Sequence, residues 1–347
     1  MRILLTGLAM MATAQAGIAR AQEVSIRETE FTFTNGPLTL HGTLTLPEGD
    51  GPFPGAVIIA GSGPTDRDGN APGGLSSRMY ALLAQGLAAQ GIASLRYDKR
   101  GLASTEGTFD MAMTTLEDFA LDAAEAARAL DTRAEIGPVF FIGHSEGGTL
   151  ALLAARGGAP VRGVVLVSTM GRSFTVVLRE QLGRQIPPPM LAQFDTAWAT
   201  YIATDDSVRY PPILASLFVP VNRRFVQSWH ALDPVRLLAD LTHAAIVVQG
   251  ETDVQVTPVD ARALAAARPD VTLALLPGVN HVLKEASGAT ANDQLMSYTD
   301  PSIPLAPSVV PSIADWILHR SRKACEAEFS FSAAGPKLES GRLEAIS

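Results

Sequence analysis

The amino-acid sequence predicts an α/β protein whose mostly parallel central sheet begins with an antiparallel hairpin. Residues 30–34 and 39–46 alternate apolar and polar side chains around an N-G-P turn, as the two strands of a hairpin do. Six short and almost continuous apolar runs follow, which is typical of strands buried on both faces of a parallel sheet. Ala- and Leu-rich segments with a helical pattern lie between these runs. The strand–helix alternation is that of an α/β architecture with helices on both faces.

The N-terminus has the pattern of a secretory signal peptide. Arg2 forms a short positive region, residues 3–12 are an uncharged apolar stretch, and an A-R-A cleavage pattern ends at Ala21. We therefore expect residues 1–21 to be removed and the protein to be exported, either to the periplasm or as a secreted protein. The apolar stretch is shorter than the roughly 20 residues that a transmembrane helix needs, so no membrane span is expected. A buried N-terminal helix is the alternative.

Six strands and four helices are expected after the hairpin. The strands are expected at residues 56–60, 93–97, 139–142, 163–167, 245–248 and 273–276, and the helices at residues 78–90, 116–130, 147–156 and 259–267. The runs are short and rich in Val, Ile and Leu, whereas the segments between them are long enough and rich enough in Ala and Leu to be helices. In a sheet of this kind the functional site lies at the carboxyl ends of the strands.

One stretch interrupts the alternation of strands and helices. Residues 172–236 are spotted with proline, helical in pattern and rich in aromatic side chains, so they are neither an ordinary connection nor a mobile loop. We expect a helical cap insertion that covers the site and supplies apolar walls to a substrate pocket; the alternative is an insertion that only packs a small core of its own. The core of the fold is then residues 22–171 and 237–321. Residues 322–347 lose the apolar periodicity, and we expect a disordered tail.

The composition excludes several classes of protein. The chain has 347 residues, 47% of them hydrophobic and 18% charged, and this composition favours one large globular domain with or without an inserted subdomain. Its formal net charge is −8 and no run of Lys or Arg interrupts the acidic balance, which argues against nucleic acid as a partner. Cys325 is the only cysteine, so an internal disulfide and a Cys-based metal site are excluded.

A strand–turn–helix motif predicts a nucleophile. The apolar run at residues 139–142 leads into G-H-S-E-G at residues 143–147, and a helix-forming segment follows directly. This context is typical of a nucleophile elbow, in which a sharp turn exposes the serine, here Ser145. The helix N-terminus favours developing negative charge, and the backbone N–H of Glu146 is expected to donate to the oxyanion. An ordinary glycine-rich turn is the alternative.

A nucleophilic serine needs a base, and six histidines are available. His281 is expected to be the base because it follows a predicted strand, in a loop at the carboxyl edge of the sheet. We expect His144 to point away from the tip of the elbow. The remaining histidines lie in the hairpin, in the cap insertion, before a strand and on the last helix: His41, His230, His243 and His319. A solvated loop side chain is the alternative for His281.

The base needs an orienting acid, which is expected at the end of the preceding strand. Asp253 lies at that position, and Glu251 and Asp260 are the alternatives. Asp260 is expected to begin the next helix as a solvated charge. The chain order is then Ser145, Asp253 and His281, which differs from the orders in the two unrelated families of serine proteases.

On these motifs the sequence resembles the α/β-hydrolase fold serine hydrolases, near their esterase and serine-aminopeptidase-like branch. The resemblance covers roughly residues 30–320 and rests on the motifs G-H-S-E-G, G-E-T-D and G-V-N-H, which end at Gly147, Asp253 and His281. Two further stretches look specific to the family: G-S-G-P-T-D-R-D-G-N from Gly61 and Y-D-K-R-G from Tyr97. The resemblance implies an α/β-hydrolase fold.

In related esterases the loop after the third strand supplies the second oxyanion donor, usually just after a His-Gly pair. Ala60 and Gly61 replace that pair here, so the resemblance implies the backbone N–H of Ser62 as the donor. Four charged residues are expected either to brace this loop or to remain solvated: Asp66, Arg67, Asp68 and Arg100.

These parts predict a serine carboxylesterase that hydrolyses short- to medium-chain carboxylic esters, a small-molecule substrate, through an acyl-enzyme on Ser145. Ester cleavage is favoured because an alkoxide leaves more easily than an amine; no cofactor and no metal ion are expected. A peptidase or amidase of the same fold is the alternative, and it needs a carboxylate in the cap insertion to bind a substrate amine. The candidates for that carboxylate are Asp195, Asp205 and Asp206. A non-catalytic binding protein is a second alternative, which the intact Ser–Asp–His set disfavours.

Overall fold

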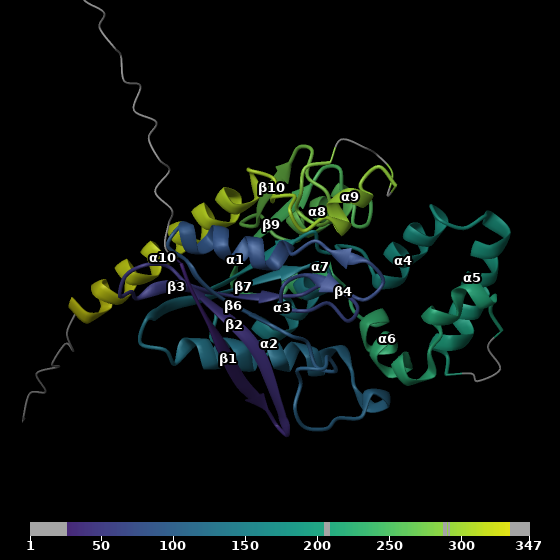
Figure 1. The fold of residues 1–347 in the computed structure, drawn as a ribbon, viewed down its shortest axis with the longest axis horizontal. Helices are drawn as coiled ribbons and strands as arrows, with labels where there is room; N and C mark the ends of the chain where they lie inside the picture. The colour runs from purple at the N-terminus through teal and green to yellow at the C-terminus, as the bar shows by residue number, and fades with distance from the viewer. Residues whose placement is uncertain (1–25, 205–208, 287–289, 291, 334–347) are drawn as a thin grey trace, which may run out of the picture.

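A computed structural model describes residues 26–204, 209–286, 290 and 292–333 (Figure 1). Within these residues an eight-stranded sheet has the order β1-β2-β6-β3-β7-β8-β9-β10. The strands are β1 (Arg27–Asn35), β2 (Leu38–Leu46), β3 (Phe53–Ile59), β6 (Ala93–Tyr97), β7 (Ile136–His144), β8 (Gly163–Val167), β9 (Ala244–Gly250) and β10 (Thr272–Leu276). β1 pairs with β2 and β2 with β6 in antiparallel register, and every pair from β6 to β10 is parallel. The predicted fold class is therefore confirmed.

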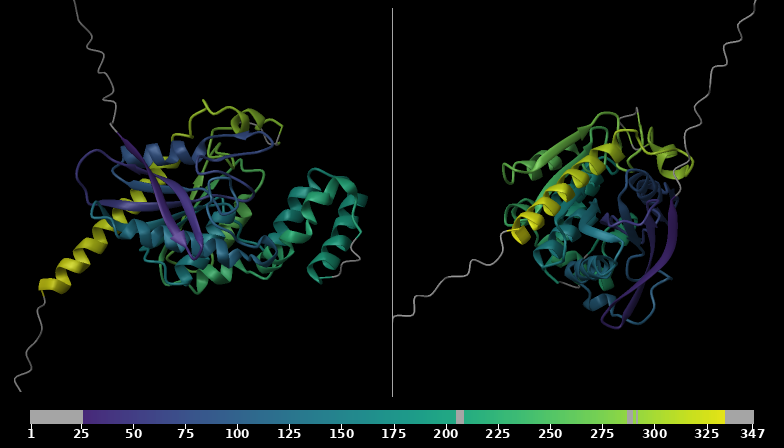
Figure 2. Two further views of the ribbon diagram at one scale, coloured as in Figure 1. Left: turned by 60° about the horizontal axis from the view of Figure 1, so that its bottom comes forward. Right: turned by 90° about the vertical axis from the view of Figure 1, so that its left-hand side faces the viewer.

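Helices cover both faces of the sheet (Figures 1 and 2). One face packs against α1 (Met79–Ala89) and α10 (Val309–Ala333). The other face packs against α2 (Leu116–Asp131), α3 (Glu146–Arg156), α7 (Pro234–Ala239) and α8 (Pro258–Ala265). Successive strand residues alternate between the two cores, because side chains along a strand point to opposite faces. Two covered faces explain why the strands appear in the sequence as continuous apolar runs.

The cap insertion projects from the core between β8 and β9 (Figures 1 and 2). It contains α4 (Phe174–Gly183), α5 (Pro188–Ile202) and α6 (Arg223–His230), with short 3-10 turns at Pro212–Leu217 and Pro220–Asn222. Its helices enclose a small apolar cluster of their own: Phe194, Ala197, Trp198, Tyr201, Leu214 and Phe218. The insertion therefore packs a small core of its own, as the alternative interpretation of the sequence expected.

An ion pair between Arg172 and the buried carboxylate of Asp260 fixes the start of the cap insertion, and it corrects the expectation that Asp260 is a solvated charge. Asp260 is fully buried in the first turn of α8. Its Oδ1 accepts hydrogen bonds from the backbone N–H of Gly171 (3.2 Å) and of Arg172 (3.0 Å). The Arg172 guanidinium pairs with both carboxylate oxygens, at 3.0 and 2.7 Å. The sequence carries no local signal of this contact, because the two residues are 88 positions apart.

Two further features of the chain differ from the sequence-based expectation or lie outside it. The loop after β3 contains a small two-stranded sheet, β4 (Asn70–Ala71) and β5 (Leu75–Ser76), which the sequence pattern did not predict. Helix α10 continues to Ala333, past the predicted start of a tail at residue 322. Lys, Ala and Glu are good helix formers, so a helix can continue after its apolar stripe ends.

The predicted signal peptide, residues 1–21, and the rest of the predicted tail lie outside the described residues. None of the helices in the described ranges combines the length and the apolar character that crossing a bilayer requires.

Candidate active site

Ser145 lies at a strained turn between β7 and α3. Its φ of 55° and ψ of −120° place a non-glycine residue in a sparsely populated region, where backbone strain is stored at functional sites. The glycines on either side have no room for a side chain. A Cβ on Gly143 would lie 2.3 Å from the carbonyl oxygen of Gly147, and a Cβ on Gly147 would lie 2.2 Å from that of Ile59. The G-x-S-x-G spacing is therefore required by close backbone packing around the serine.

The structure brings His281 and Asp253 together. His281 Nδ1 lies 2.8 Å from Asp253 Oδ2, and both side chains are buried. Asp253 Oδ1 accepts the backbone N–H groups of Gln255 (2.8 Å) and Val256 (2.9 Å). Burial disfavours the charged carboxylate, but the charge and hydrogen bond of His281 together with these N–H groups outweigh burial and hold the pKa of Asp253 below its ordinary value. An ionised Asp253 therefore accepts Nδ1–H of His281 and leaves Nε2 as the free ring nitrogen.

Neither alternative acid takes part in this pair. Glu251 is exposed at the same strand end, and Asp260 is bound to Arg172. Two of the other histidines have partners elsewhere: His230 Nδ1 lies 2.6 Å from Thr175 Oγ1 at the base of the cap insertion, and His41 lies 3.3 Å from Glu106.

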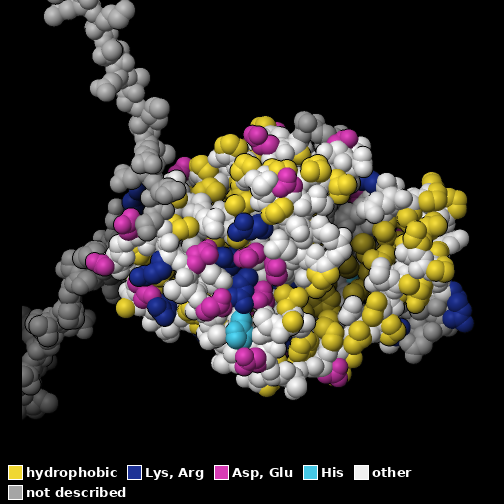
Figure 3. Space-filling model, in the orientation of Figure 1, with side chains coloured by type: hydrophobic (Ala, Val, Ile, Leu, Met, Phe, Trp, Pro, Cys, Tyr) yellow, Lys and Arg dark blue, Asp and Glu magenta, His cyan; other side chains and the backbone are white. Residues whose placement is uncertain are grey.

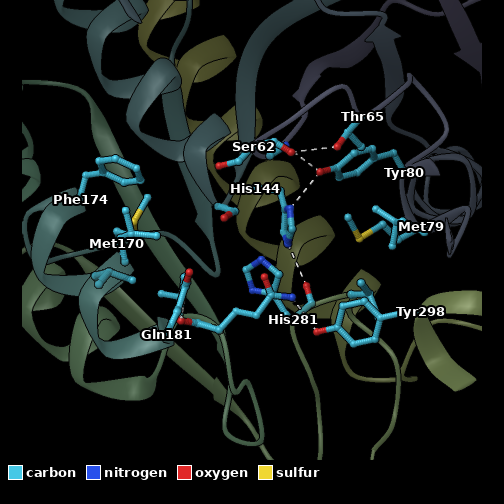
Figure 4. A pocket seen from close by; sticks show the side chains of 18 of the residues that line it. Ser62, Thr65, Met79, Tyr80, His144, Met170, Phe174, Gln181, His281 and Tyr298 are labelled. Carbon is cyan, nitrogen blue, oxygen red and sulfur yellow. Dashed lines mark hydrogen bonds between the residues drawn. The ribbon is translucent and has the colours of Figure 1, made fainter. Parts of the chain in front are cut away.

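Ser145 and His281 line one pocket of about 280 Å³, at the junction of the core and the cap insertion (Figure 4). Helix α4 supplies Phe174, Val177, Leu178 and Gln181 to its wall, and α6 supplies Trp229. In Figure 3 hydrophobic side chains gather over the cap insertion and around the hollow between it and the core. The cap insertion thus contributes mainly apolar surface beside the serine, in addition to packing its own core.

His144 is part of the site, whereas the sequence led us to expect that it points away from the tip of the elbow. Its ring lines the pocket and lies 4.7 Å from the ring of His281, between centroids. Its Nε2 lies 2.8 Å from the backbone oxygen of His281, so this nitrogen carries the proton. Its Nδ1 accepts the hydroxyl of Tyr80 (2.9 Å), and that hydroxyl accepts the N–H of Gly61 (2.8 Å). A chain of hydrogen bonds therefore connects the loop after β3 to the backbone of His281 (Figure 4).

The stability of the protein is expected to depend on His144 below neutral pH. Burial and the positive charge of His281 lower the pKa of His144 to about 3. In the unfolded chain a histidine has a pKa near 6.5. Between about pH 6.5 and pH 3, His144 is therefore protonated in the unfolded chain but not in the folded protein. This contribution to stability is complete above pH 6.5 and decreases by about 2 kcal/mol by pH 5. The control is His144→Gln, which keeps a donor near Nε2 and does not titrate. Urea unfolding of both proteins at pH 7 and pH 5 measures the difference, and a constant difference would contradict the lowered pKa.

Charged side chains brace the loop after β3. Arg67 donates from its backbone N–H (2.7 Å) and from Nε (3.0 Å) to Asp98, and Asp68 pairs with Arg96 at 3.0 Å. The carboxylate of Asp66 accepts N–H groups within the loop itself. The bracing that the sequence suggested is therefore present for three of the four residues: Arg67 and Asp68 have partners at the end of β6 and on it, and Asp66 has its partners within the loop.

The fourth residue, Arg100, has a different role from the one suggested. Its guanidinium pairs with Asp122 of α2 at 2.7 Å and donates to the backbone oxygen of Asp118 at 2.8 Å. Arg100 therefore connects the segment that follows β6 to α2.

The two residues whose N–H groups are expected to bind an oxyanion lie next to the pocket or in its wall. Ser62 lines it, and Glu146 begins α3 directly after Ser145. The loop after β3 packs closely on the elbow, because a Cβ on Gly61 would lie 3.2 Å from Ser145 Cβ and 3.2 Å from His144 Nδ1.

Comparisons with known proteins find similarity to hydrolases. A family described as serine aminopeptidase, S33, matches residues 73–204. Esterase EstD of Thermotoga maritima is 27% identical over 283 residues, which are 80% of this chain, and the chain spans 65% of the length of that esterase. Proline iminopeptidase of Mycobacterium smegmatis superposes with a TM-score of 0.54 and 17% identity, covering 85% of this chain and all of that one. Est1E of Butyrivibrio proteoclasticus, solved with ferulic acid, superposes with a TM-score of 0.52 and 15% identity, covering 84% and 98%. The protein has the α/β-hydrolase fold and resembles the serine hydrolases of that fold, esterases and serine aminopeptidases in particular.

Proposed function

We propose that the protein is a serine carboxylesterase that hydrolyses short- to medium-chain carboxylic esters. The observation that carries the proposal is the 2.8 Å contact between Asp253 and Nδ1 of His281, which leaves Nε2 free at the pocket that Ser145 lines. The similarity to esterase EstD supports ester chemistry. The three side chains then form a catalytic triad.

In the proposed reaction, His281 Nε2 takes the proton of Ser145 Oγ as that oxygen attacks the ester carbonyl carbon. The carbonyl oxygen becomes an oxyanion, which accepts the backbone N–H groups of Glu146 and Ser62. His281 then gives its proton to the leaving alcohol. Water, deprotonated by the same imidazole, attacks the acyl carbon; the bond to Ser145 Oγ then breaks, and His281 returns the proton to Oγ as the acid leaves. Asp253 holds the required tautomer and stabilises the imidazolium.

The pocket favours an ester over an aminoacyl amide. None of the described residues that line it is Asp or Glu, so no carboxylate on this wall is placed to bind a substrate amine. Asp195 pairs with Arg179 at 2.7 and 2.9 Å on the exposed side of the cap insertion. Asp205 and Asp206 lie outside the described residues. The similarity to serine aminopeptidases keeps the peptidase as the second candidate.

A substrate panel tests the proposal. Initial rates are measured with p-nitrophenyl esters from acetate to palmitate and with aminoacyl p-nitroanilides. We expect the highest kcat/KM for acyl chains of about two to eight carbons and a value at least about 100-fold lower for the anilides, because the pocket is small and apolar and an amine leaves less readily. Faster cleavage of the anilides would replace the esterase by the peptidase.

Replacing Phe174 is expected to change which acyl chains are preferred. The Phe174 ring stacks on Trp229 with centroids 3.9 Å apart, and both residues line the pocket. Phe174→Ala leaves space beside the serine, so the optimum of the ester series should move to chains at least about two carbons longer. Val176→Ala on the same helix is the control, because Val176 is exposed and does not line the pocket. An unchanged profile in Phe174→Ala would show that the acyl chain does not contact this wall.

We also propose that the protein is exported after removal of residues 1–21. The intact mass of protein recovered from the periplasm and the medium of expressing bacteria tests this proposal. A chain beginning at Gln22 is expected, and a cytoplasmic chain that retains residues 1–21 would contradict it.

A further inference from the structure

Lys99 is a buried lysine that contacts residues of the site but does not line the pocket. Lys99 follows β6, its side chain is only 6% exposed, and its Nζ donates to the backbone oxygen of Gly61 at 2.5 Å. Nζ also pairs with Oε1 of Glu146 at 3.2 Å, and the Glu146 side chain is only 3% exposed. Removing both charges from water is costly, and a well-packed apolar pair of similar volume is often at least as stable. Stability alone therefore does not account for an ion pair at this place.

The two partners of Lys99 are the residues on which the proposed oxyanion hole depends. The carbonyl group of Gly61 and the N–H group of Ser62 belong to one planar peptide unit, which is not among the cis bonds of the described chain. In a trans peptide these two groups point in opposite directions. A Gly61 carbonyl bound to Lys99 therefore turns the N–H of Ser62 away from the lysine, and Ser62 lines the pocket. The ammonium also polarises the peptide, which strengthens its N–H as a donor.

The second partner, Glu146, supplies the other expected N–H from its own backbone. Lys99 therefore contacts both expected donors of the oxyanion hole. It binds the side chain of Glu146 and the Gly61–Ser62 peptide. The preceding peptide is held as well, because the N–H of Gly61 donates to the Tyr80 hydroxyl at 2.8 Å. With Ser145 Cβ only 3.2 Å from the position of a Cβ on Gly61, the loop has little room for another arrangement.

We propose that Lys99 is a positioning residue for the oxyanion hole: its ammonium orients the N–H of Ser62 and fixes it relative to Glu146. Lys99 touches neither the substrate nor the reacting atoms. This inference rests on the proposed esterase function and adds to it a residue that acts through the backbone. Its effect is expected in the transition state, where the oxyanion forms, and much less in substrate binding.

The neighbouring residue offers a matched control. Arg100 also forms a buried ion pair, with side chains 7% exposed for Arg100 and 2% for Asp122, but it binds α2 and not the loop after β3. Lys99→Met and Arg100→Met each remove a cation from a buried pair next to the same strand end. Only Lys99→Met removes the donor to Gly61.

The experiment compares kcat and KM of the wild type and the two variants on the p-nitrophenyl ester that the wild type cleaves best. We expect Lys99→Met to lower kcat by about 10- to 100-fold with KM changed less than about threefold, because misplacing one oxyanion donor costs part of its full effect. Arg100→Met should keep both constants within about threefold. Lys99→Gln, which retains an N–H donor for Gly61, should recover part of the lost kcat. The affinity for a trifluoromethyl ketone, which forms a tetrahedral oxyanion on Ser145, should weaken in Lys99→Met in parallel with kcat/KM.

Three results would overturn the role of Lys99: an unchanged kcat in Lys99→Met, an equal loss in Arg100→Met, or a loss that falls on KM alone. If Lys99→Met does not fold, Lys99→Gln is judged against the wild type by the same split between kcat and KM. A wild type that cleaves no ester refutes the proposed function instead. Lys99 is then tested by the rate at which a fluorophosphonate labels Ser145, since that reaction also places developing negative charge on an oxygen.

Discussion

Replacing Ser145 with alanine is expected to lower kcat/KM for the preferred p-nitrophenyl ester by on the order of 10⁴- to 10⁶-fold, the range found when a serine nucleophile is removed. Alanine has no oxygen to attack the carbonyl, so no acyl-enzyme forms. The fold should be retained, because the turn is held by the packing of Gly143 and Gly147 and not by the serine hydroxyl. Initial rates with the purified proteins measure the effect, and thermal unfolding shows whether the variant is folded.

The matched control for this prediction is Ser168→Ala. Ser168 is a second buried serine with a positive φ, 47°, at the end of the adjacent strand β8, and it does not line the pocket. Its replacement should leave kcat/KM within about threefold. A fluorophosphonate should label the wild type and Ser168→Ala but not Ser145→Ala. Activity that survives in Ser145→Ala would exclude the acyl-enzyme mechanism.

The parts of the fold that the sequence predicts are those whose signals are local. The strand at residues 163–167 is predicted with its exact bounds, because β8 is a glycine followed by four apolar residues, all buried, and such runs are typical of strands covered on both faces. The elbow is predicted because its steric requirements lie within five consecutive residues, Gly143 to Gly147. His281 and Asp253 are predicted from their positions after consecutive strands, since parallel strands bring their carboxyl ends to one edge of the sheet.

The parts that the sequence does not predict depend on contacts between distant segments. Tyr80 and His144 are 64 positions apart, and Arg172 and Asp260 are 88 apart, so neither contact has a spacing that a pattern can reveal. A buried aspartate and a solvated one also look identical in a sequence.

The segment after β6 shows how finely such contacts can vary. Three successive charged residues there have different partners: Asp98 binds Arg67 and Lys99 binds Gly61, both in the loop after β3, whereas Arg100 binds α2. The sequence marks this segment as unusual, but only the fold distinguishes the roles of its members.

Asp253→Asn is expected to lower kcat by on the order of 10³- to 10⁴-fold, as an acid-to-amide change does in other serine triads. The backbone N–H groups of Gln255 and Val256 both donate to Oδ1, so the oxygen of an asparagine must take that position. Its NH₂ group then replaces Oδ2, 2.8 Å from His281 Nδ1. A donor at this position forces Nδ1 to accept and places the proton on Nε2. That nitrogen can no longer take the proton of Ser145.

Glu251→Gln is the control for the acid-to-amide change, because Glu251 is an exposed carboxylate two residues away at the end of the same strand. Its kcat should remain within about twofold of the wild type, since Glu251 touches neither His281 nor the pocket wall.

The pH dependence of stability gives a second test of the role of Asp253. The lowered pKa of Asp253 means that the carboxylate stays ionised as the pH falls below the ordinary range of aspartate. The stability that this hydrogen-bonded carboxylate provides is therefore complete above the ordinary pKa of aspartate and is lost as the pH falls from there through the lowered pKa, whereas Asp253→Asn should lack this acid-sensitive component. If Asp253→Asn retained kcat while Glu251→Gln lost it, the orienting acid would be Glu251, reached by a movement of the loop after β9.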